Sequence, residues 1–278
     1  MKSSFEKVGF LLSYREVCPP AEVAHLAYCF MEFAVVNDLP DPIPHEVYPD
    51  GCISVIYRRN QRLGLEMILL KGLSLEPFYT QVFAGDVHWG VRLLPSAAAA
   101  VLRCDPTAIK TRPVSDSQGQ LDVTSGLLEK LHECEDFCEA QSVLTATLLG
   151  LNIAPEQIDP RVSAAVKLIS DTNGEARVSE ISRSIGISQR QLERLFKESS
   201  GITLKQFARL QRFRVTAKNI LENDFTWATR SAEMGFADQA HMNREISSLT
   251  NHSPRSFEQI VKKIDHRNIV GDESTRTE

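Results

Sequence analysis

The 278-residue sequence lacks several features that would place it in common classes of protein. No stretch approaches the roughly 18 to 20 consecutive apolar residues that a transmembrane helix needs. The first residues, MKSSFEKVGFLLSYREV, contain no basic segment followed by a sustained apolar core, so they do not resemble a secretory signal. We therefore expect a cytoplasmic protein with no membrane partner.

Cysteine is present, but its spacing indicates no particular chemistry. None of the six cysteines forms a CxxC pair, and a cytosolic compartment argues against a disulfide framework. His132, Cys134 and Cys138 lie close together in the sequence, and the two cysteines would share a helix face at i, i+4. A metal or thiol sensor is one interpretation of this group. Half-buried cysteines on an apolar helix face are the favoured one.

Signatures of catalysis are also missing. The sequence contains no Walker loop, GxGxxG after a strand, HExxH, GxSxG or protein-kinase set. His45, Asp86 and His88 fall in the first half, where a barrel could gather them around a metal, but their spacing matches no ligand signature. We therefore expect no enzyme activity, no catalytic residue, no metal and no cofactor.

Charge is unevenly distributed along the chain, whose net charge is −5. Residues 1–154 hold 12 Lys/Arg against 19 Asp/Glu, whereas residues 155–265 hold 17 against 14. Within 177–218 the balance is 10 against 3. A basic block in an acidic chain suits a phosphate-binding surface, because counterion release supplies most non-specific affinity for DNA. A solvated helix face is the alternative explanation.

The first half carries strand signals. A YPDG turn at 48–51 precedes β-branched and aromatic residues, and further strand-like segments at 64–72, 77–86 and 89–95 are separated by Gly and Pro. Such short strands predict a small barrel or sandwich.

Residues 124–150 change to a helical period. The apolar positions are Leu127, Leu128, Leu131, Cys134, Cys138, Leu144 and Leu148. This stripe either packs on the barrel or pairs with the same helix of a second subunit, and we expect the contact of a homodimer here. Pro155 and Pro160 mark the boundary between a domain at 1–154 and a domain at 155–265.

The second half contains only helical patterns. A short helix at 179–185 stops at Gly186, and the next helix begins with Ser188 as N-cap. A short helix, a glycine turn and a basic amphipathic helix are the pattern of a helix-turn-helix. The pattern recurs at an offset of 49 to 50 residues, which pairs Gly186 with Gly235 and Arg194 with Arg244. Between the copies lies one linker helix of about 18 residues, or roughly 27 Å. That length suits successive major-groove turns, about 34 Å apart.

These residues resemble the AraC/XylS family of bacterial transcription regulators. The resemblance is strongest over 177–221 and over 231–257, SAEMGFADQAHMNREISSLTNHSPRSF. It implies seven helices forming two helix-turn-helix units around a linker helix. The sequence departs from the family pattern at four positions: Ser182 and Ser231 replace a usual Ala, Asn251 a usual Gly and Leu204 a common Pro. In the first half, PDGC at 49–52 and GVRLLP at 90–95 resemble a cupin-like sensor domain, although Ser96 stands where Gly is expected.

The expected fold class is α+β. It combines a β-rich, barrel-like N-terminal domain with helices and an all-α C-terminal domain of two helix-turn-helix units. Residues 266–278 are expected to form a disordered tail. The expected function is sequence-specific, DNA-binding regulation of transcription, responding to a small effector or acting through dimerisation. Double-stranded DNA is the expected partner, with RNA polymerase if the chain is an activator.

Outward positions of the second helix of each unit are the candidate DNA-binding residues. In the first unit they are Gln189, Arg190, Glu193, Arg194 and Lys197. In the second unit they are Gln239, Ala240, Asn243 and Arg244. We expect Asp238 to be an N-cap and His241 to pack, while Arg244 is either a base reader or a salt-bridge partner. An alkyl-transfer repair protein is a rival with the same DNA-binding domain, but it would need a cysteine cluster around Cys52 or Cys104.

Overall fold

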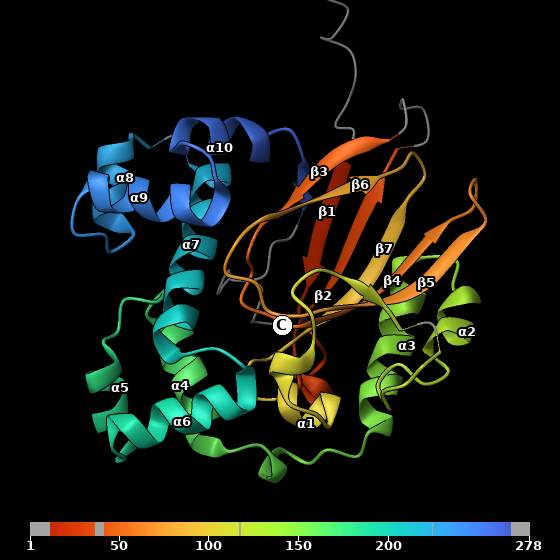
Figure 1. The fold of residues 1–278 in the computed structure, drawn as a ribbon, viewed down its shortest axis with the longest axis horizontal. Helices are drawn as coiled ribbons and strands as arrows, with labels where there is room; N and C mark the ends of the chain where they lie inside the picture. The colour runs from red at the N-terminus through yellow and green to blue at the C-terminus, as the bar shows by residue number, and fades with distance from the viewer. Residues whose placement is uncertain (1–11, 37–41, 117, 224, 268–278) are drawn as a thin grey trace, which may run out of the picture.

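A computed structural model describes residues 12–36, 42–116, 118–223 and 225–267, and for 265–267 the backbone alone (Figure 1). Its first part is rich in strands and its second part is helical, so the expected α+β class is confirmed. We call residues 12–158 the β-rich unit and residues 160–261 the helical unit.

The β-rich unit contains a seven-stranded sheet in the order β8-β5-β4-β7-β2-β1-β9. All its pairings are antiparallel except that of β1 with β9. Its strands are β1 Leu12–Val17, β2 Ala27–Val35, β4 Ser54–Asn60, β5 Leu65–Lys71, β7 Val87–Leu93, β8 Val114–Ser115 and β9 Asp265–Arg267. A separate pair joins β3 Ile43–Val47 to β6 Phe78–Val82. Within the described residues the strands form these two sheets and no closed barrel.

Alternation along the strands gives the large sheet two different faces. In β4, Val55 and Tyr57 belong to a core that includes the helices α1 Ala98–Leu102, α2 Leu127–His132 and α3 Phe137–Gly150. The intervening Ser54, Ile56 and Arg58 line a cavity together with residues of β3 and β6. One face therefore packs on helices, and the other encloses a cavity.

The single helix expected at 124–150 is wrong, because the chain breaks between α2 and α3. Asp136 caps α3 by accepting a hydrogen bond from the Glu139 backbone N–H at 3.0 Å. Cys134 lies buried in the break and Cys138 is exposed on α3, so the two cysteines do not share a helix face. His132 contacts Glu66 instead, at 2.7 Å. The apolar stripe itself packs on the large sheet.

The helical unit has the seven helices that the resemblance implied. They are α4 Pro160–Asp171, α5 Val178–Ile185, α6 Gln189–Ser200, α7 Leu204–Glu222, α8 Trp227–Glu233, α9 Gln239–Thr250 and α10 Pro254–Val261. Figure 1 shows α7 running from α4 and α6 at one end to α8, α9 and α10 at the other. One hydrophobic core continues through all seven, with Phe196, Phe207 and Phe257 among its fully buried side chains.

The chain returns to the β-rich unit after α10. Asp265–Arg267 pairs with β1 in parallel, so the backbone of His266 and Arg267 is part of a sheet rather than of the expected tail. Backbone pairing with an exposed edge strand needs no particular side-chain pattern, which explains why the sequence did not indicate it. The rest of the expected tail, 268–278, lies outside the described residues.

Candidate nucleic-acid interface and internal cavity

The first helix-turn-helix unit follows the local signals in its sequence. Helix α5 ends at Gly186, whose φ of 78° is left-handed. Ser188 begins α6 by accepting a hydrogen bond from the Gln191 backbone N–H at 3.2 Å. Leu192 and Phe196 are fully buried, so α6 presents its polar face to solvent.

All five candidate residues of the first unit are exposed on α6: Gln189, Arg190, Glu193, Arg194 and Lys197. The Gln189 side-chain amide donates to Glu193 at 3.3 Å, and Arg194 pairs with Glu198 at 2.9 Å. Both contacts lie on the helix surface. An exposed i, i+4 pair is worth only about 0.3–0.5 kcal/mol, so DNA can replace it at little cost.

The second unit repeats this arrangement with α8 and α9. Asp238 caps α9 by accepting from the His241 backbone N–H at 2.5 Å, which confirms its expected role. Three of the candidates are exposed: Gln239, Ala240 and Arg244. Asn243 is only half-buried, and its Oδ1 is a buried atom without a hydrogen-bond partner. Its outward exposure is therefore smaller than the sequence suggested.

Two further expectations in the second unit concern side chains that pack. His241 lies edge-on to Phe236 with ring centroids 5.6 Å apart, and its Nδ1 accepts weakly from Ala237 N–H at 3.4 Å. Packing is the role that the sequence predicted for it. Arg244 forms no ion pair in the part of the chain described, because the neighbouring Glu245 pairs with Arg209 of α7 at 2.5 Å.

The three arginines of α7 point to three different places. Arg209 contacts α9 through Glu245, and Arg212 donates to the Gly174 carbonyl oxygen at 2.6 Å. Arg212 also lies over the Phe236 ring, so it joins the first unit to the second. Arg214 instead contacts Glu16 of the β-rich unit.

Arg230 of α8 is a structural residue that the sequence analysis missed. It is 1% exposed, its guanidinium donates to Asn219 and to the Asn223 carbonyl oxygen, and it lies over the Trp227 ring. At the repeat offset of 49 it occupies the position of Ile181. An arginine in place of a buried apolar residue was the signal that could have identified it.

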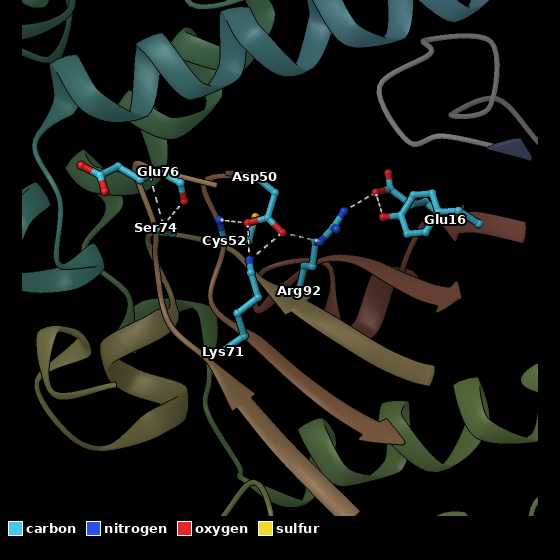
Figure 2. A network of polar contacts seen from close by, with 8 residues as sticks. Glu16, Asp50, Cys52, Lys71, Ser74, Glu76 and Arg92 are labelled. Carbon is cyan, nitrogen blue, oxygen red and sulfur yellow. Dashed lines mark hydrogen bonds and ion pairs between the residues drawn. The ribbon is translucent and has the colours of Figure 1, made fainter. Parts of the chain in front are cut away.

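A cavity of about 380 Å³ lies between the large sheet and the β3–β6 pair. Its apolar lining includes Met31, Phe33, Ile56, Leu69, Phe78 and Val82. At one end stand Asp50, Lys71 and Arg92, with Lys71 2.9 Å and Arg92 3.1 Å from the carboxylate (Figure 2). Ser54, which is 1% exposed, has a side-chain hydroxyl without a partner among the described residues. The cavity thus combines an apolar body with polar groups at its wall.

Two histidines of the cavity flank Phe33, with ring centroids 4.8 Å away for His45 and 5.5 Å for His88. Burial lowers the pKa of His45 to about 4. Burial and the nearby Arg58 lower the pKa of His88 to about 3. Asp86 turns away toward Arg58 and Asn60, at 2.6 and 2.8 Å, so it does not join the histidines.

Cys52 is buried beside this cavity, and its backbone N–H donates to Asp50. Burial raises the pKa of its thiol to about 12, which keeps the sulfur protonated. Within the described residues no group of three His, Cys, Asp or Glu side chains is placed to hold a metal ion. Nothing in this geometry favours an alkyl-transfer function.

Comparison with known proteins agrees with this arrangement of helices. A family model described as a helix-turn-helix domain matches residues 181–260. The probable transcription factor PqrA of Proteus vulgaris is 29% identical over 85 residues, which cover 31% of this chain and 70% of PqrA. The matched region contains helices α6 and α9 and the sequence GFADQAHMNR. Residues 181–260 form a helix-turn-helix domain of the AraC type.

Solved structures give further likenesses to AraC-type proteins. An AraC-type DNA-binding domain from Chromobacterium violaceum is 23% identical, with a TM-score of 0.35, and the match covers 37% of this chain and 92% of that one. ToxT from Vibrio cholerae O395 is 12% identical, with a TM-score of 0.42, over 90% of this chain and 97% of ToxT.

The helix-turn-helix domain and the similarity to a transcription factor make the chain a DNA-binding regulator of transcription. None of the helices in the described ranges is both long enough and apolar enough to cross a bilayer.

Proposed function

We propose that this chain is a sequence-specific regulator whose helices α6 and α9 enter successive turns of the DNA major groove. The main support for this proposal is that both helices bury apolar residues and expose polar residues at equivalent positions of the repeat. A solvated helix face alone would not require this duplication.

Each exposed side chain has a base or phosphate group that it suits. Arg190 and Arg194 match the O6 and N7 acceptors of guanine, Gln189 matches adenine, and Glu193 accepts from cytosine N4. Lys197, near the end of α6, suits a phosphate.

In the second unit Gln239 and Asn243 suit adenine, Arg244 suits guanine, and Ala240 suits a thymine methyl group. Because Ala240 carries no charge and Asn243 is half-buried, we infer that the first unit contributes more affinity.

The cavity in the β-rich unit is our proposed site for a small effector. Its volume lies within the 300–1,000 Å³ common for small-molecule sites, and an apolar lining with a few polar groups is typical of them. The proposal also includes a homodimer, a cytoplasmic location and, if the chain activates transcription, contact with RNA polymerase.

Selection of bound DNA from a random duplex pool at near-physiological salt tests the DNA-reading function. We expect an enriched motif with two blocks separated by about one helical turn, roughly 10 base pairs. Salt-sensitive binding without any enriched motif would contradict sequence-specific recognition by this chain.

The effector site needs a separate measurement. A library of small metabolites is screened for an increase in the unfolding temperature of the whole chain, and active compounds are repeated on Thr80→Trp. Thr80 is exposed at the cavity wall, so the indole fills space without disturbing a buried core. We expect the substitution to abolish the increase. Compounds that stabilise both proteins equally would place the effector elsewhere.

A further inference from the structure

One turn of the β-rich unit contacts the second helix-turn-helix unit and the linker helix α7. We call residues 46–52 the bridging turn. Tyr48 lies edge-on to Phe257 of α10, with ring centroids 5.0 Å apart, and Glu46 contacts His252 at 2.6 Å. Gly51 lies against α7, where a methyl group on it would stand 3.5 Å from Phe207 and Leu210. The bridging turn therefore joins the second unit to the part of α7 that packs on the first.

The β-rich unit contacts the first unit at a second place. A methyl group on Gly201, which ends α6, would lie 3.3 Å from Pro106 in the 3₁₀ turn at Pro106–Ala108. Helix α1 also packs beside α6. The two recognition helices are thus connected twice, once through α7 and once through the β-rich unit.

The strongest polar contact between the units is made at Glu16 of β1. Its side chain is 1% exposed and accepts hydrogen bonds from Arg92, from the Tyr14 hydroxyl and from Arg214 of α7. The Arg214 guanidinium also lies over the Tyr28 ring, 4.8 Å from its centroid. Burial alone would lower the pKa of Arg214, but Glu16 raises it well above its usual value. The two charges stabilise each other in a place that excludes water.

This contact is continuous with the polar wall of the cavity. Arg92 lies between Glu16 on one side and Asp50 on the other, and Asp50 also pairs with Lys71 (Figure 2). Burial would raise the pKa of Asp50, but Lys71 and Arg92 hold it well below its usual range. Asp50 belongs to the bridging turn, so these polar contacts connect Glu16 to that turn.

We propose that the β-rich unit holds the two helix-turn-helix units in one relative placement, through the bridging turn and the Glu16–Arg214 contact. The proposal rests on the DNA-reading function above. In this placement the polar faces of α6 and α9 both remain exposed, and the proposal assigns binding of both blocks of the motif to the held form.

The physical effect is one of effective concentration. When the first unit is bound, a held second unit needs no ordering to reach the next groove turn, whereas a loosely attached one does. Loss of the hold should weaken binding to a duplex with both blocks of the motif. It should leave binding to a duplex with one block unchanged.

Arg214→Met in the full chain tests the proposal, with Lys218→Met as its control. Glu16 keeps Arg92 and Tyr14 as partners when Arg214 is replaced, so no buried carboxylate is left alone. Lys218 lies one turn further along α7, is nearly as buried, and pairs within the helix with Glu222. Both variants therefore lose one positive charge from α7, and only one of them loses a contact with the β-rich unit.

We expect Arg214→Met to bind the two-block duplex roughly tenfold more weakly than Lys218→Met, within the 5- to 150-fold range typical of coupled sites. The two variants should bind the one-block duplex equally. His252→Ala removes the independent contact with Glu46, should give the same selective loss, and serves if Arg214→Met unfolds. Equal effects on both duplexes in both test variants would overturn the proposal. A wild-type chain without any motif preference would overturn the DNA-reading function as well.

Discussion

At the scale of single residues, we expect two arginines of α6 to provide most of the specificity for the DNA motif. Arg190 and Arg194 are exposed one turn apart, and only Arg194 has a partner in the described residues, at the surface. Each good contact with a guanine is worth roughly 1–3 kcal/mol of discrimination. Arg190→Ala/Arg194→Ala should therefore lose several kcal/mol of affinity for the selected motif, measured by competition against a scrambled duplex.

The control is Arg177→Ala/Arg183→Ala, which removes two exposed positive charges at or beside α5, the helix that does not enter the groove. Loss of phosphate contacts should weaken binding to both duplexes alike and reduce its salt dependence. If the α6 variant kept its preference for the motif, α6 would not be the recognition helix.

Two histidines that line the cavity predict a loss of stability in mild acid. The folded-state pKa is about 4 for His45 and about 3 for His88, below the unfolded value near 6.5. Between pH 7 and pH 4 the unfolded chain therefore binds more protons, and the free energy of unfolding falls as the pH is lowered. Urea unfolding at pH 7 and pH 5 measures the fall, which His45→Gln/His88→Gln should reduce. An unchanged pH dependence in that variant would assign the fall to other groups.

Capping residues were predictable because their signals are local. Ser188, Asp238 and Ser253 all accept from a backbone N–H three residues on, and the sequence predicted the first two to be N-caps. The partners of Glu16 were not predictable. Arg92 and Arg214 lie far along the chain, and no periodicity specifies which carboxylate meets which guanidinium. The exposed positions of α6 followed from the helical period, whereas the half-buried Asn243 depends on tertiary packing of α9.

At the scale of the element, two left-handed glycines differ in what surrounds them. Gly174 has a φ of 79°, and a methyl group on it would lie 2.1 Å from the Ala208 carbonyl oxygen of α7. Gly186 has a φ of 78° with nothing within 4 Å of that position. Gly186→Ala should lower the free energy of unfolding by only about 1–2 kcal/mol, the cost of placing alanine in a left-handed conformation. Gly174→Ala should cost clearly more, because α4 and α7 must move apart.

Chemical unfolding of the two alanine variants measures the difference directly, since both start from the same backbone conformation. Similar losses for Gly174→Ala and Gly186→Ala would mean that α4 and α7 separate easily at this crossing.

The apolar period predicted helical structure at 124–150 but not its interruption. Leu131 and Phe137 face the same core on either side of the break, so the stripe continues across it. Asp136 was an available N-cap signal that a purely periodic analysis passes over. Strand β2 was missed for a different reason: most of its residues are buried, so its sequence does not alternate.

At the scale of the whole molecule, the sequence predicted two parts and the order of helices in the second. Local signals explain that order. Gly186 and Gly235 each mark the turn of one unit, and the Ser253–Pro254 pair marks the start of α10. The repeat aligned the two units with each other. The placement of one part on the other depends on contacts such as Tyr48 with Phe257. Neither residue carries a signal for the other, because an aromatic edge contact has no sequence pattern.

The last prediction concerns the homodimer. The inward face of α3 is occupied by the sheet, so only its outward face remains for a second chain. That face presents Ser142, Ala146 and Leu149, and the one charged residue of α3 is Glu139 in its first turn. An exposed helix face normally carries charge, whereas small and apolar side chains permit two helices to approach closely. A two-fold axis would use each of these residues twice.

Light scattering of the protein as it elutes from a size-exclusion column at high concentration measures its oligomeric state directly, and we expect a dimer. Leu149→Glu should shift it to monomer, because a charge would face its own copy across the axis. Leu63→Glu is the matched control, since the exposed fractions of the two leucines are 48% and 49% and Leu63 lies in the turn between β4 and β5. A wild-type monomer, or equal behaviour of the two variants, would exclude α3 as the dimer contact.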